Sequence, residues 1–451
     1  MGKLFGTDGI RGEANREPMT IGLAQRLGAA VALVLGKRDN RSQRVIIGKD
    51  TRLSCYMFEQ AIASGLCSMG AEAIFTGPLP TPGISFITTS MRADIGVVIS
   101  ASHNPYQDNG IKLFDRFGFK LPDEVEDEIE KVIEEKSFQN NLPPPSAIGK
   151  AYRIDDAQGR YIVHCKNTFP KEFALEDMRV AVDAANGAAY GVAPTIFEEL
   201  GAKVFATGVN PDGRNINHNC GALFPENVSR AVVHRRANIG LALDGDGDRV
   251  IICDERGKIV DGDKIMAILA KDMLEREKLV GKTVVTTVMS NMGFEIALKN
   301  LGIKLIRTQV GDRYVVEEMR RGGYVLGGEQ SGHIILLEHA TTGDGIIAAL
   351  QTLAVMLRTG KPLSELAGVM ETFPQKLINI KVAKKPPIEE LKKTSKMIKE
   401  FERRLAGKGR ILVRYSGTEL KARVMIEGES EKLIDEMANE IAKTIKEEIG
   451  E

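Results

Sequence analysis

The stretch RVIIG at residues 44–48 opens a pattern that occurs three times along this chain. In each copy a short apolar stretch is followed by a helical stretch, a glycine and a second apolar stretch. The three pairs are RVIIG (44–48) with GAEAIFTG (70–77), RVAVD (179–183) with GAKVFATG (201–208), and KTVVT (282–286) with GIKLIRT (302–308). Strands that alternate with helices and glycine-marked turns predict parallel α/β units. A repeat of this length indicates three copies of a whole domain, not a solenoid of short repeats.

A third apolar stretch in each copy ends in a polar loop. These stretches cover residues 95–99, 239–243 and 323–327, and the loops that follow read SASHNP (100–105), DGDGDR (244–249) and GEQSGH (328–333). Ligands of parallel α/β sheets bind beyond the carboxyl ends of the strands. We therefore expect the three loops to face one central cleft.

The length of the chain and its linkers predict four domains. At roughly 150 residues per domain, a chain of 451 residues suggests about three domains, and the C-terminal segment that remains after the three repeats indicates a fourth. An acidic helix at 123–136 precedes the proline-rich segment 139–146, which cannot continue it and marks the first linker. We predict an α/β protein with three repeated α/β domains with mixed sheets at 1–142, 151–254 and 255–370, plus a smaller C-terminal α+β domain at 375–451. In that last domain we expect a strand at 378–382, a helix at 388–405, two strands around 414–418 and a helix at 431–449.

The composition excludes several classes of protein. Lys and Arg number 61 against 61 Asp and Glu, so no net field attracts nucleic acid or membranes. The N-terminus lacks a basic segment followed by an apolar run, and no 18 consecutive apolar residues occur. The five cysteines are odd in number and lack C-x-x-C spacing, which favours reduced thiols. We expect a soluble cytoplasmic protein that binds neither nucleic acid nor membranes.

The first loop contains a candidate nucleophile, Ser102, with His103 beside it and Lys112 nearby. A serine hydroxyl is a weak nucleophile unless a neighbouring base or metal activates it. The cation of Lys112 suits an anion held near Ser102. The alternative is a polar turn in which Asn104-Pro105 ends the strand.

The second loop alternates Asp244, Asp246 and Asp248 with glycines. Three neighbouring carboxylates repel one another unless a hard cation neutralises them, and oxygen ligands favour Mg²⁺ over zinc or copper. The spacing resembles the start of an EF-hand loop, but the distal Glu and the flanking helices are missing. An acidic β-turn is the alternative. We predict a Mg²⁺ site that stabilises charge on a transferred phosphoryl group.

Two further clusters have the composition of binding sites. Glu329, Ser331 and His333 are presented on glycines, which suits close hydrogen bonding to a polyhydroxyl ligand, although a plain glycine-rich turn is the alternative. The C-terminal cluster consists of Arg414, Ser416, Gly417, Thr418 and Arg423. Its two guanidinium groups can bind an oxyanion, and hydroxyls and the Gly417 amide can complete the shell. Solvated strand arginines are the alternative here. No nucleotide-binding glycine pattern opens a helix, which argues against NAD or ATP.

Together, the four clusters resemble the active-site serine, metal, sugar and phosphate loops of the α-D-phosphohexomutase superfamily, in the order in which that superfamily has them. The resemblance covers residues 5–428. It implies that Ser102 carries a phosphoryl group and passes it to a bound sugar phosphate. The resulting bisphosphorylated sugar would turn around and return its other phosphate to Ser102.

The same resemblance implies roles for the remaining residues. Asp244, Asp246 and Asp248 would ligate Mg²⁺ together with an oxygen of phosphorylated Ser102. Arg11 and Arg249 would offset phosphoryl charge, while His103 and Lys112 are both candidates for proton transfer. Glu329 and Ser331 would bind the sugar hydroxyls at C3 and C4, assisted by His333. The phosphate that is not reacting would be held by the C-terminal cluster: Arg414, Ser416, Gly417, Thr418 and Arg423.

Four segments resemble the branch of the superfamily that acts on glucosamine phosphates: FGTDGIRG (5–12), VGDRYV (310–315), GEQSGH (328–333) and SGTE (416–419). Members that act on glucose or mannose phosphates usually have Met in place of Gln330 and Gly-His in place of Gly311-Asp312. Leu420 departs from the Pro or Asn of many relatives. The expected activity interconverts glucosamine 6-phosphate and glucosamine 1-phosphate. The rivals are a glucose or mannose phosphate mutase and a Mg²⁺-dependent sugar phosphatase. We expect a homodimer that acts on a small hexosamine phosphate.

Overall fold

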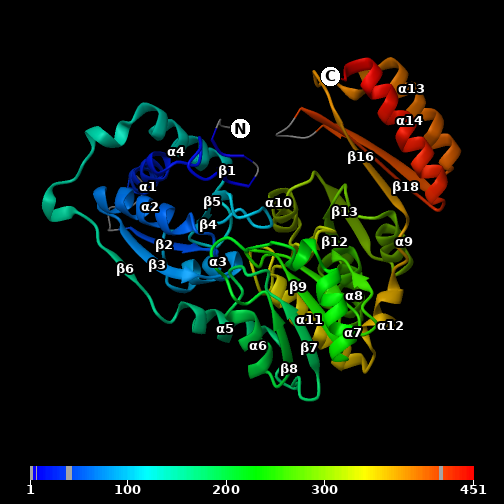
Figure 1. Cartoon of the computed structure of the whole chain (residues 1–451), viewed down its shortest axis with the longest axis horizontal. Coiled ribbons are helices and arrows are strands. Elements are labelled where there is room, and N and C mark those ends of the chain that lie inside the picture. Colours follow the sequence, from blue (N-terminus) through cyan, green and yellow to red (C-terminus); the bar gives the residue numbers. More distant parts are fainter. Residues whose placement is uncertain (1–3, 7, 37–42, 416–419, 451) are drawn as a thin grey trace. The chain divides into compact units, whose positions relative to one another are not determined.

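The computed structural model describes residues 4–6, 8–36, 43–415 and 420–450, which form two compact units (Figure 1). The larger unit spans Met1–Met289 and Ile303–Val369, and the smaller one spans Ser290–Gly302 and Met370–Glu451. The larger unit holds three sheets and the smaller unit holds the fourth. Among the helices of the described residues, none combines the length and the apolar character needed to cross a membrane.

The first sheet has the strand order β1-β5-β4-β2-β3-β6. Its parallel strands are β2 (Arg44–Lys49), β3 (Glu72–Pro78), β4 (Ile95–Ile99) and β6 (Ala151–Arg153). β5 (Asp108–Asp115) runs antiparallel to β4, and β1 (Ile10–Glu13) runs antiparallel to β5. Its helices are α1 (Ile21–Gly36), α2 (Cys55–Ser68), α3 (Thr81–Ser90) and α4 (Asp123–Glu135). Because β6 pairs with β3, residues 151–153 extend this first sheet beyond the proline-rich linker.

Burial on both faces explains why the central strands of this sheet are continuous apolar runs. Val45 and Ile47 of β2 lie in a core cluster with residues of α1, α2 and α4. Ile46 points to the opposite face, because side chains alternate along a strand. On that face Gly48 lies against α3, where an added Cβ would be 2.4 Å from Ile84 Cδ1.

The second sheet repeats this arrangement with the order β11-β10-β9-β7-β8. β7 (Arg179–Asp183), β8 (Lys203–Thr207) and β9 (Ile239–Leu243) are parallel, whereas β10 (Val250–Cys253) and β11 (Ile259–Val260) continue the sheet in antiparallel pairs. The accompanying helices are α5 (Ala157–Thr168), α6 (Val192–Glu199) and α7 (Glu226–Arg235). The acidic hexapeptide 244–249 forms the connection from β9 to β10.

The third sheet has the order β13-β12-β14-β15. β12 (Thr283–Thr287), β13 (Lys304–Thr308) and β14 (Leu326–Gly328) are parallel, and β15 (Ile334–Leu336) is antiparallel to β14. The helices of this part of the larger unit are α8 (Gly262–Glu275), α10 (Asp312–Gly322), α11 (Gly345–Thr359) and α12 (Leu363–Leu366). β14 begins later than the strand predicted at 323–327, because α10 continues to Gly322 and ends at Gly323, which has a left-handed φ of 67°.

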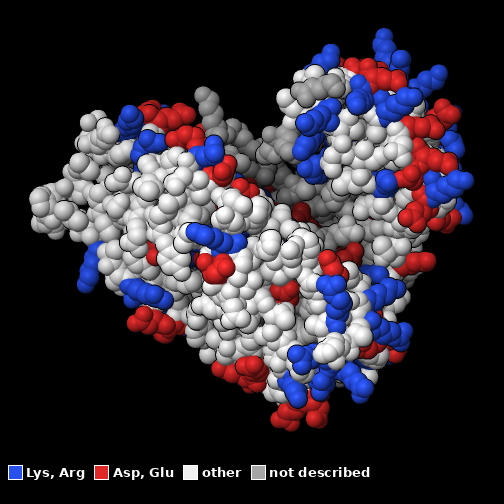
Figure 2. All heavy atoms as spheres, in the orientation of Figure 1, with Lys and Arg blue, Asp and Glu red and all other residues white. Residues whose placement is uncertain are grey.

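The smaller unit contains the antiparallel sheet β16-β18-β17. Its strands are β16 (Gln375–Lys381), β17 (Gly409–Tyr415) and β18 (Lys421–Gly428), and its helices are α9 (Met292–Asn300), α13 (Lys392–Leu405) and α14 (Glu431–Ile449). Phe401 of α13 and Ile441 of α14 pack into a core with the sheet residue Val424. Charges of both signs cover these two helices (Figure 2).

Across the two units, short 3-10 helices occur at Ser137–Asn140, Pro145–Ala147, Gly221–Leu223, Val280–Lys282, Ala367–Val369 and Ile388–Glu390.

The predicted fold class is confirmed. Three α/β sheets of mixed strand direction follow one another, and a smaller α+β sheet comes last. In the first two copies the third strand is the predicted one, β4 and β9. The polar loops therefore begin where these buried strands end.

Candidate active site

Ser102 lies in the loop after β4, and its hydroxyl is aimed at the acidic loop. Its Oγ donates to Asp244 Oδ2 at 2.7 Å and lies 3.2 Å from Nδ1 of His103. Only 1% of the residue is exposed. Its backbone has a φ of 52°, a left-handed conformation that costs a non-glycine residue on the order of 1–3 kcal/mol and persists only where surrounding contacts impose it. The structure thus brings together a hydroxyl, an imidazole and a carboxylate.

The three carboxylates of the acidic loop are buried side by side. Ligand oxygens of Asp244, Asp246 and Asp248 all lie within 4.8 Å of one another. Burial, and then repulsion from Asp248 and Asp246, raises the pKa of Asp244 well above its usual range. Gly245 permits the approach of this loop to the serine loop, because a Cβ at that position would be 2.5 Å from the Ser102 carbonyl oxygen.

These residues fit a divalent cation. Asp246 Oδ1 and Asp248 Oδ1 are buried and make no hydrogen bond. Buried carboxylate oxygens without a partner are costly, and a hard cation with oxygen ligands removes that cost. The donor set is three carboxylates without Cys or His, which favours Mg²⁺, Ca²⁺ or Mn²⁺ over zinc. The expectation of a metal site is therefore supported by the geometry of this loop.

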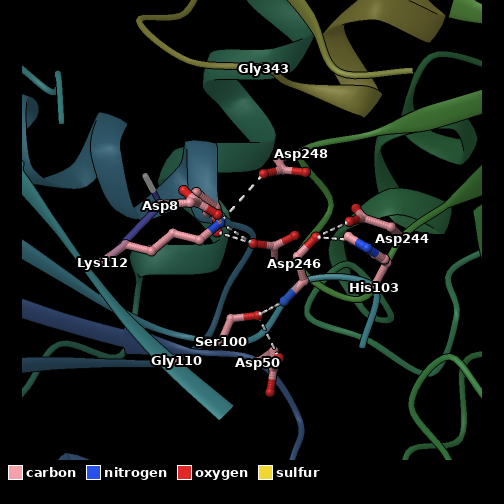
Figure 3. Close-up of polar contacts among 12 residues, drawn as sticks. Asp8, Asp50, Ser100, His103, Gly110, Lys112, Asp244, Asp246, Asp248 and Gly343 are labelled. Carbon is pink, nitrogen blue, oxygen red and sulfur yellow. Dashed lines mark hydrogen bonds and ion pairs between the residues drawn. The ribbon is translucent and has the colours of Figure 1, made fainter. Parts of the chain in front are cut away.

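Lys112 lies among the carboxylates (Figure 3). Its Nζ is 3.1 Å from Asp246 Oδ2, 3.4 Å from Asp8 Oδ2 and 3.7 Å from Asp248 Oδ2. Burial alone would lower the pKa of Lys112, but these carboxylates outweigh it and raise the pKa above its ordinary value. Lys112 is therefore a cation at neutral pH.

Lys112 belongs to a closed ring of ionisable side chains in which carboxylates alternate with Lys or His. Asp8 also pairs with Lys120, and Lys120 Nζ lies 2.6 Å from Asp312 Oδ2. Nε2 of His333 is 3.6 Å from Asp312 Oδ2, and its Nδ1 is 3.5 Å from Asp248 Oδ2. The contact of Asp248 with Lys112 closes the ring. We call these six residues the charge ring: Lys112, Asp8, Lys120, Asp312, His333 and Asp248.

His333 is buried in this ring, with 2% of its surface exposed. The Gly343 amide donates to its Nε2 at 3.1 Å, which leaves the ring proton on Nδ1, facing Asp248. Burial lowers the pKa of His333, but Asp248 outweighs it and raises the pKa. The contacts of His333 are therefore with the metal loop and Asp312, and its predicted assistance to sugar binding stays a prediction.

The remaining charged residues predicted for this site lie close to the serine loop. Burial, followed by the nearby Arg249 and Arg11, lowers the pKa of His103 to about 4. His103 is consequently neutral at neutral pH. Arg249 Nε is 3.7 Å from Asp248 Oδ1, and Arg11 pairs with Asp8. The Nε of each arginine is buried and makes no hydrogen bond.

The third loop positions its polar side chains through its own contacts. Glu329 Oε1 accepts from the Gly311 amide at 3.3 Å, and the exposed Ser331 lies with its Oγ 3.5 Å from Glu329 Oε2. Gln330 is directed away from them and donates to Asp261 Oδ2 at 3.2 Å. Glu329 and Ser331 are thus the members of this loop that are available to a ligand.

Part of the C-terminal cluster lies in the described residues of the smaller unit. Arg414 of β17 and Arg423 of β18 are direct cross-strand partners. Burial, and then the charge of Arg423, lowers the pKa of Arg414. Like charges placed opposite each other destabilise a sheet, and an anion bound between them would remove the repulsion. Ser416, Gly417 and Thr418 lie outside the described residues.

Several residues of the site were not singled out by sequence reasoning: Asp8, Asp50, Arg52, Lys120, Asn217 and Asp312. Asp8 and Asp312 occur in two segments, 5–12 and 310–315, on which the resemblance was based, so a signal for them was present. Asp50 and Arg52 stand in GKDTRLS at 48–54, just after β2. A polar turn at the carboxyl end of a buried parallel strand was the signal available there.

Comparison with known families agrees with this architecture. Four family models described as phosphoglucomutase/phosphomannomutase match the chain: domain I at residues 2–140, domain II at 159–257, domain III at 261–373 and the C-terminal domain at 377–444. The chain therefore belongs to the phosphoglucomutase/phosphomannomutase family.

Similar full-length proteins narrow the family to a branch. A protein of Myxococcus xanthus named phosphoglucosamine mutase is 59% identical over 98% of this chain and 96% of its own length. One of Pelobacter propionicus with the same name is 58% identical over the whole of both chains. The predicted resemblance to phosphoglucosamine mutases is confirmed by these relatives.

Solved structures show the same fold at low sequence identity. A phosphoglucomutase/phosphomannomutase family protein of Burkholderia thailandensis is 22% identical, with a TM-score of 0.80 over 98% of this chain and 97% of its own. The N-acetylphosphoglucosamine mutase of Aspergillus fumigatus, solved with GlcNAc-6P and magnesium, is 19% identical, with a TM-score of 0.63 over 98% of this chain and 95% of its own.

Proposed function

We propose that this chain is an isomerase that interconverts glucosamine 6-phosphate and glucosamine 1-phosphate. One observation carries the proposal: the Ser102 hydroxyl lies 2.7 Å from a carboxylate of the buried Asp244, Asp246 and Asp248 cluster. A nucleophile beside a candidate cation site is the arrangement that phosphoryl transfer through serine requires. The names of the relatives at 58–59% identity support the choice of sugar.

In the proposed cycle the enzyme starts with Ser102 phosphorylated. A free hydroxyl of the sugar phosphate attacks the phosphorus, its new O–P bond forms as the bond to Ser102 Oγ breaks, and its proton passes through an enzyme base to Oγ. The bisphosphorylated sugar then turns around. Ser102 Oγ attacks the other phosphate, its proton goes to the departing sugar oxygen, and phosphoserine is restored. The cycle neither gains nor loses a phosphoryl group.

The protonation states separate the two candidates for proton transfer. His103 is neutral and lies 3.2 Å from Ser102 Oγ, so it can accept a proton there. Lys112 is held as a cation by three carboxylates, so it has no free lone pair at neutral pH. We therefore assign His103 as the base and Lys112 as a fixed positive charge near the phosphoryl group.

We propose Mg²⁺ as the cation of the acidic loop, held by Asp244, Asp246 and Asp248. When bound, it would supply positive charge that stabilises the transferred phosphoryl group. The Aspergillus fumigatus relative solved with magnesium supports this choice. Arg11 and Arg249 would bind phosphoryl oxygens through their guanidinium groups.

Sugar and distal phosphate would be bound by the other two clusters. Glu329 and Ser331 are assigned to the sugar hydroxyls at C3 and C4, since both are open to a ligand. Arg414 and Arg423, with Ser416, Gly417 and Thr418, are assigned to the phosphate that is not reacting. A single phosphate site of this kind must accept the substrate in either orientation, because both monophosphates are handled by one serine.

A ³¹P-NMR time course with glucosamine 6-phosphate and Mg²⁺ tests the proposal. We expect the glucosamine 1-phosphate signal to appear without inorganic phosphate, and we expect Ser102→Ala to abolish it. Intact-mass measurement should show one phosphate on the wild-type chain and none on the variant. Faster turnover of glucose 1-phosphate or mannose 1-phosphate would indicate a different mutase of the family. Release of inorganic phosphate alone would indicate a phosphatase.

The proposal also covers the cellular compartment and the partners of the enzyme. None of the five cysteines forms a disulfide, which is consistent with a reducing compartment. We propose a cytoplasmic enzyme with a hexosamine phosphate as its partner and no nucleic acid. A homodimer remains a prediction, to be tested by light scattering of the purified chain.

A further inference from the structure

Arg52 is the largest side chain that is completely buried in the described residues, with none of its surface exposed. It lies in the turn between β2 and α2. Burial of a guanidinium is costly unless its donors are used and its charge is paired. Both conditions are met, because its Nε donates to Asp50 Oδ2 at 2.8 Å.

The other donors of Arg52 all go to one loop. Nη2 donates to the carbonyl oxygens of Ser102 at 2.9 Å and Asn104 at 2.8 Å. Nη1 donates to the carbonyl oxygen of Asp108 at 3.0 Å and also to that of Pro105. One rigid, planar group therefore binds four carbonyls within seven residues of the serine loop. Lysine, with a single nitrogen, cannot reproduce this pattern.

Asp50 extends the same contacts to the other side of Ser102. Its Oδ2 accepts from Ser100 Oγ at 2.6 Å, and Ser100 Oγ accepts from the Ser102 amide at 2.9 Å (Figure 3). The carbonyl of Ser102 is thus held by Arg52, and its amide is held by Asp50 through Ser100. Both backbone groups of the strained residue are therefore held by side chains of the turn between β2 and α2.

The domain that contains the second sheet provides a second, independent hydrogen-bond donor to the serine loop. Asn217 Nδ2 donates to the carbonyl oxygens of Ser102 at 2.8 Å and Asn104 at 3.0 Å, the same two that Arg52 Nη2 binds. These shared acceptors explain how Ser102 keeps its φ of 52°. From this backbone position Ser102 Oγ donates to Asp244 Oδ2 at 2.7 Å.

We propose that Arg52 is a positioning residue that holds Ser102 in the left-handed conformation required for phosphoryl transfer. The proposal rests on the function proposed above. Arg52 touches no reacting group. Its guanidinium donors are all used by Asp50 and the four carbonyl oxygens, so none is left for substrate. Its loss would let Ser102 relax and move Oγ away from the acidic loop. Both transfer steps would slow, whereas substrate affinity would stay unchanged.

The test measures transfer to Ser102 directly. Wild type and Arg52→Lys are first dephosphorylated and then mixed with glucosamine 1,6-bisphosphate, and phosphate on the chain is followed by intact mass in a single turnover. We expect phosphorylation of Arg52→Lys and its kcat to fall about 10²-fold, the size of effect that a 1 Å misplacement produces. KM should remain at the wild-type value. Guanidinium ion should restore part of the rate in Arg52→Ala, and ammonium ion should not.

Arg358→Met is the matched control, because Arg358 pairs with Asp272 far from the serine loop in sequence. It should lower the melting temperature and leave the phosphorylation rate intact. Should Arg52→Lys fail to fold, Arg52→Ala with guanidinium ion decides: a phosphorylation rate that guanidinium ion raises supports the proposal, and a rate that it leaves unchanged overturns it. A wild-type rate in folded Arg52→Lys also overturns it, as does an equal loss in Arg358→Met. If wild type itself takes up no phosphate at Ser102, the proposed function fails and this inference fails with it.

Discussion

Burial of the three carboxylates of the acidic loop is energetically unfavourable. Asp244, Asp246 and Asp248 are each 1–4% exposed, and Lys112 neutralises only part of their charge. Burial, and then repulsion from Asp248 and Asp246, disfavours the ionised form of Asp244 and raises its pKa. The three buried carboxylates therefore lower the stability of the folded protein, and a bound cation would restore that stability.

Magnesium should therefore stabilise the protein through this loop. We expect MgCl₂ at a hundred times its dissociation constant to stabilise wild type by about 2.7 kcal/mol, seen as a rise in melting temperature. Asp244→Asn should melt no lower than wild type in EDTA, since the amide cannot ionise beside the other two carboxylates, and should lose most of the Mg²⁺ effect and the transfer activity. Differential scanning calorimetry with and without EDTA makes the measurement. An equal Mg²⁺ shift in both proteins would place the cation elsewhere.

Asp344 gives a pH-dependent prediction. It accepts the Tyr161 hydroxyl at 2.8 Å and caps α11, and burial raises its pKa to about 6. Between pH 4 and 6 the unfolded chain has lost this proton while the folded chain keeps it, so stability falls as pH rises through that window. The loss approaches about 3 kcal/mol above pH 6.

Asp344→Asn removes this titration and keeps an oxygen for the cap. The melting temperature of the variant relative to wild type should therefore rise between pH 4 and pH 6 and stay level above pH 7. A difference that does not change with pH would show that Asp344 is ionised in the folded protein throughout.

At the scale of elements, α1 and α2 cross at glycines. A Cβ on Gly65 of α2 would lie 2.0 Å from the Gln25 carbonyl oxygen, and one on Gly28 of α1 would lie 2.2 Å from the Ile62 carbonyl oxygen. Backbones this close leave no room for a methyl group. The pair of helices covers one face of the first sheet, the sheet that contains β4 and the serine loop after it.

Two alanine substitutions separate this contact from helix propensity. Gly65→Ala should destabilise the protein by about 1–3 kcal/mol through overpacking. Gly22→Ala, in α1 with nothing within 4 Å of the added Cβ, should stabilise it by up to about 1 kcal/mol. Thermal unfolding measures both, and KM should not change in either. Equal effects of the two substitutions would mean that the crossing tolerates a methyl group.

At the scale of the larger unit, the charge ring connects three sheets. Lys112, Asp8 and Lys120 come from the first-sheet domain, Asp248 from the second, and Asp312 and His333 from the third. Removing one partner from a buried ionic network leaves an uncompensated charge, whereas replacing a whole pair by apolar residues is far less costly. Through the ring, the folding stability of each sheet domain in this unit therefore depends on the other two.

Lys120→Met tests this dependence. We expect a loss of about 3–5 kcal/mol, because Asp312 and Asp8 then lose their shared cation. The double variant Lys120→Met with Asp312→Leu should recover part of it. Lys131→Met, at the exposed pair with Glu135, should change stability by less than about 1 kcal/mol. Urea unfolding of the four proteins makes the comparison, and a double variant as unstable as the single one would contradict the argument.

The sequence by itself determined the features that depend on near neighbours. Three signals depend only on local sequence: the period of the apolar stretches, the glycines after them, and the three aspartates within five residues. From these signals the sheets, the fold class and the candidate metal loop could be predicted. Ser102 was singled out because its hydroxyl stands in the polar loop after one of these strands, with His103 beside it.

Only the tertiary structure decided which distant side chains meet. Arg52 lies 50 residues before Ser102, and Lys120 lies 192 residues before Asp312, and neither position is unusual within its own segment. The structure also turned His333 toward the metal loop and Gln330 toward Asp261, although both stand in the loop predicted to bind sugar. A hydrogen bond or ion pair depends on distances of about 3 Å between atoms. Periodicity along a chain specifies which face a residue occupies, but only the packing of folded domains brings such atoms together.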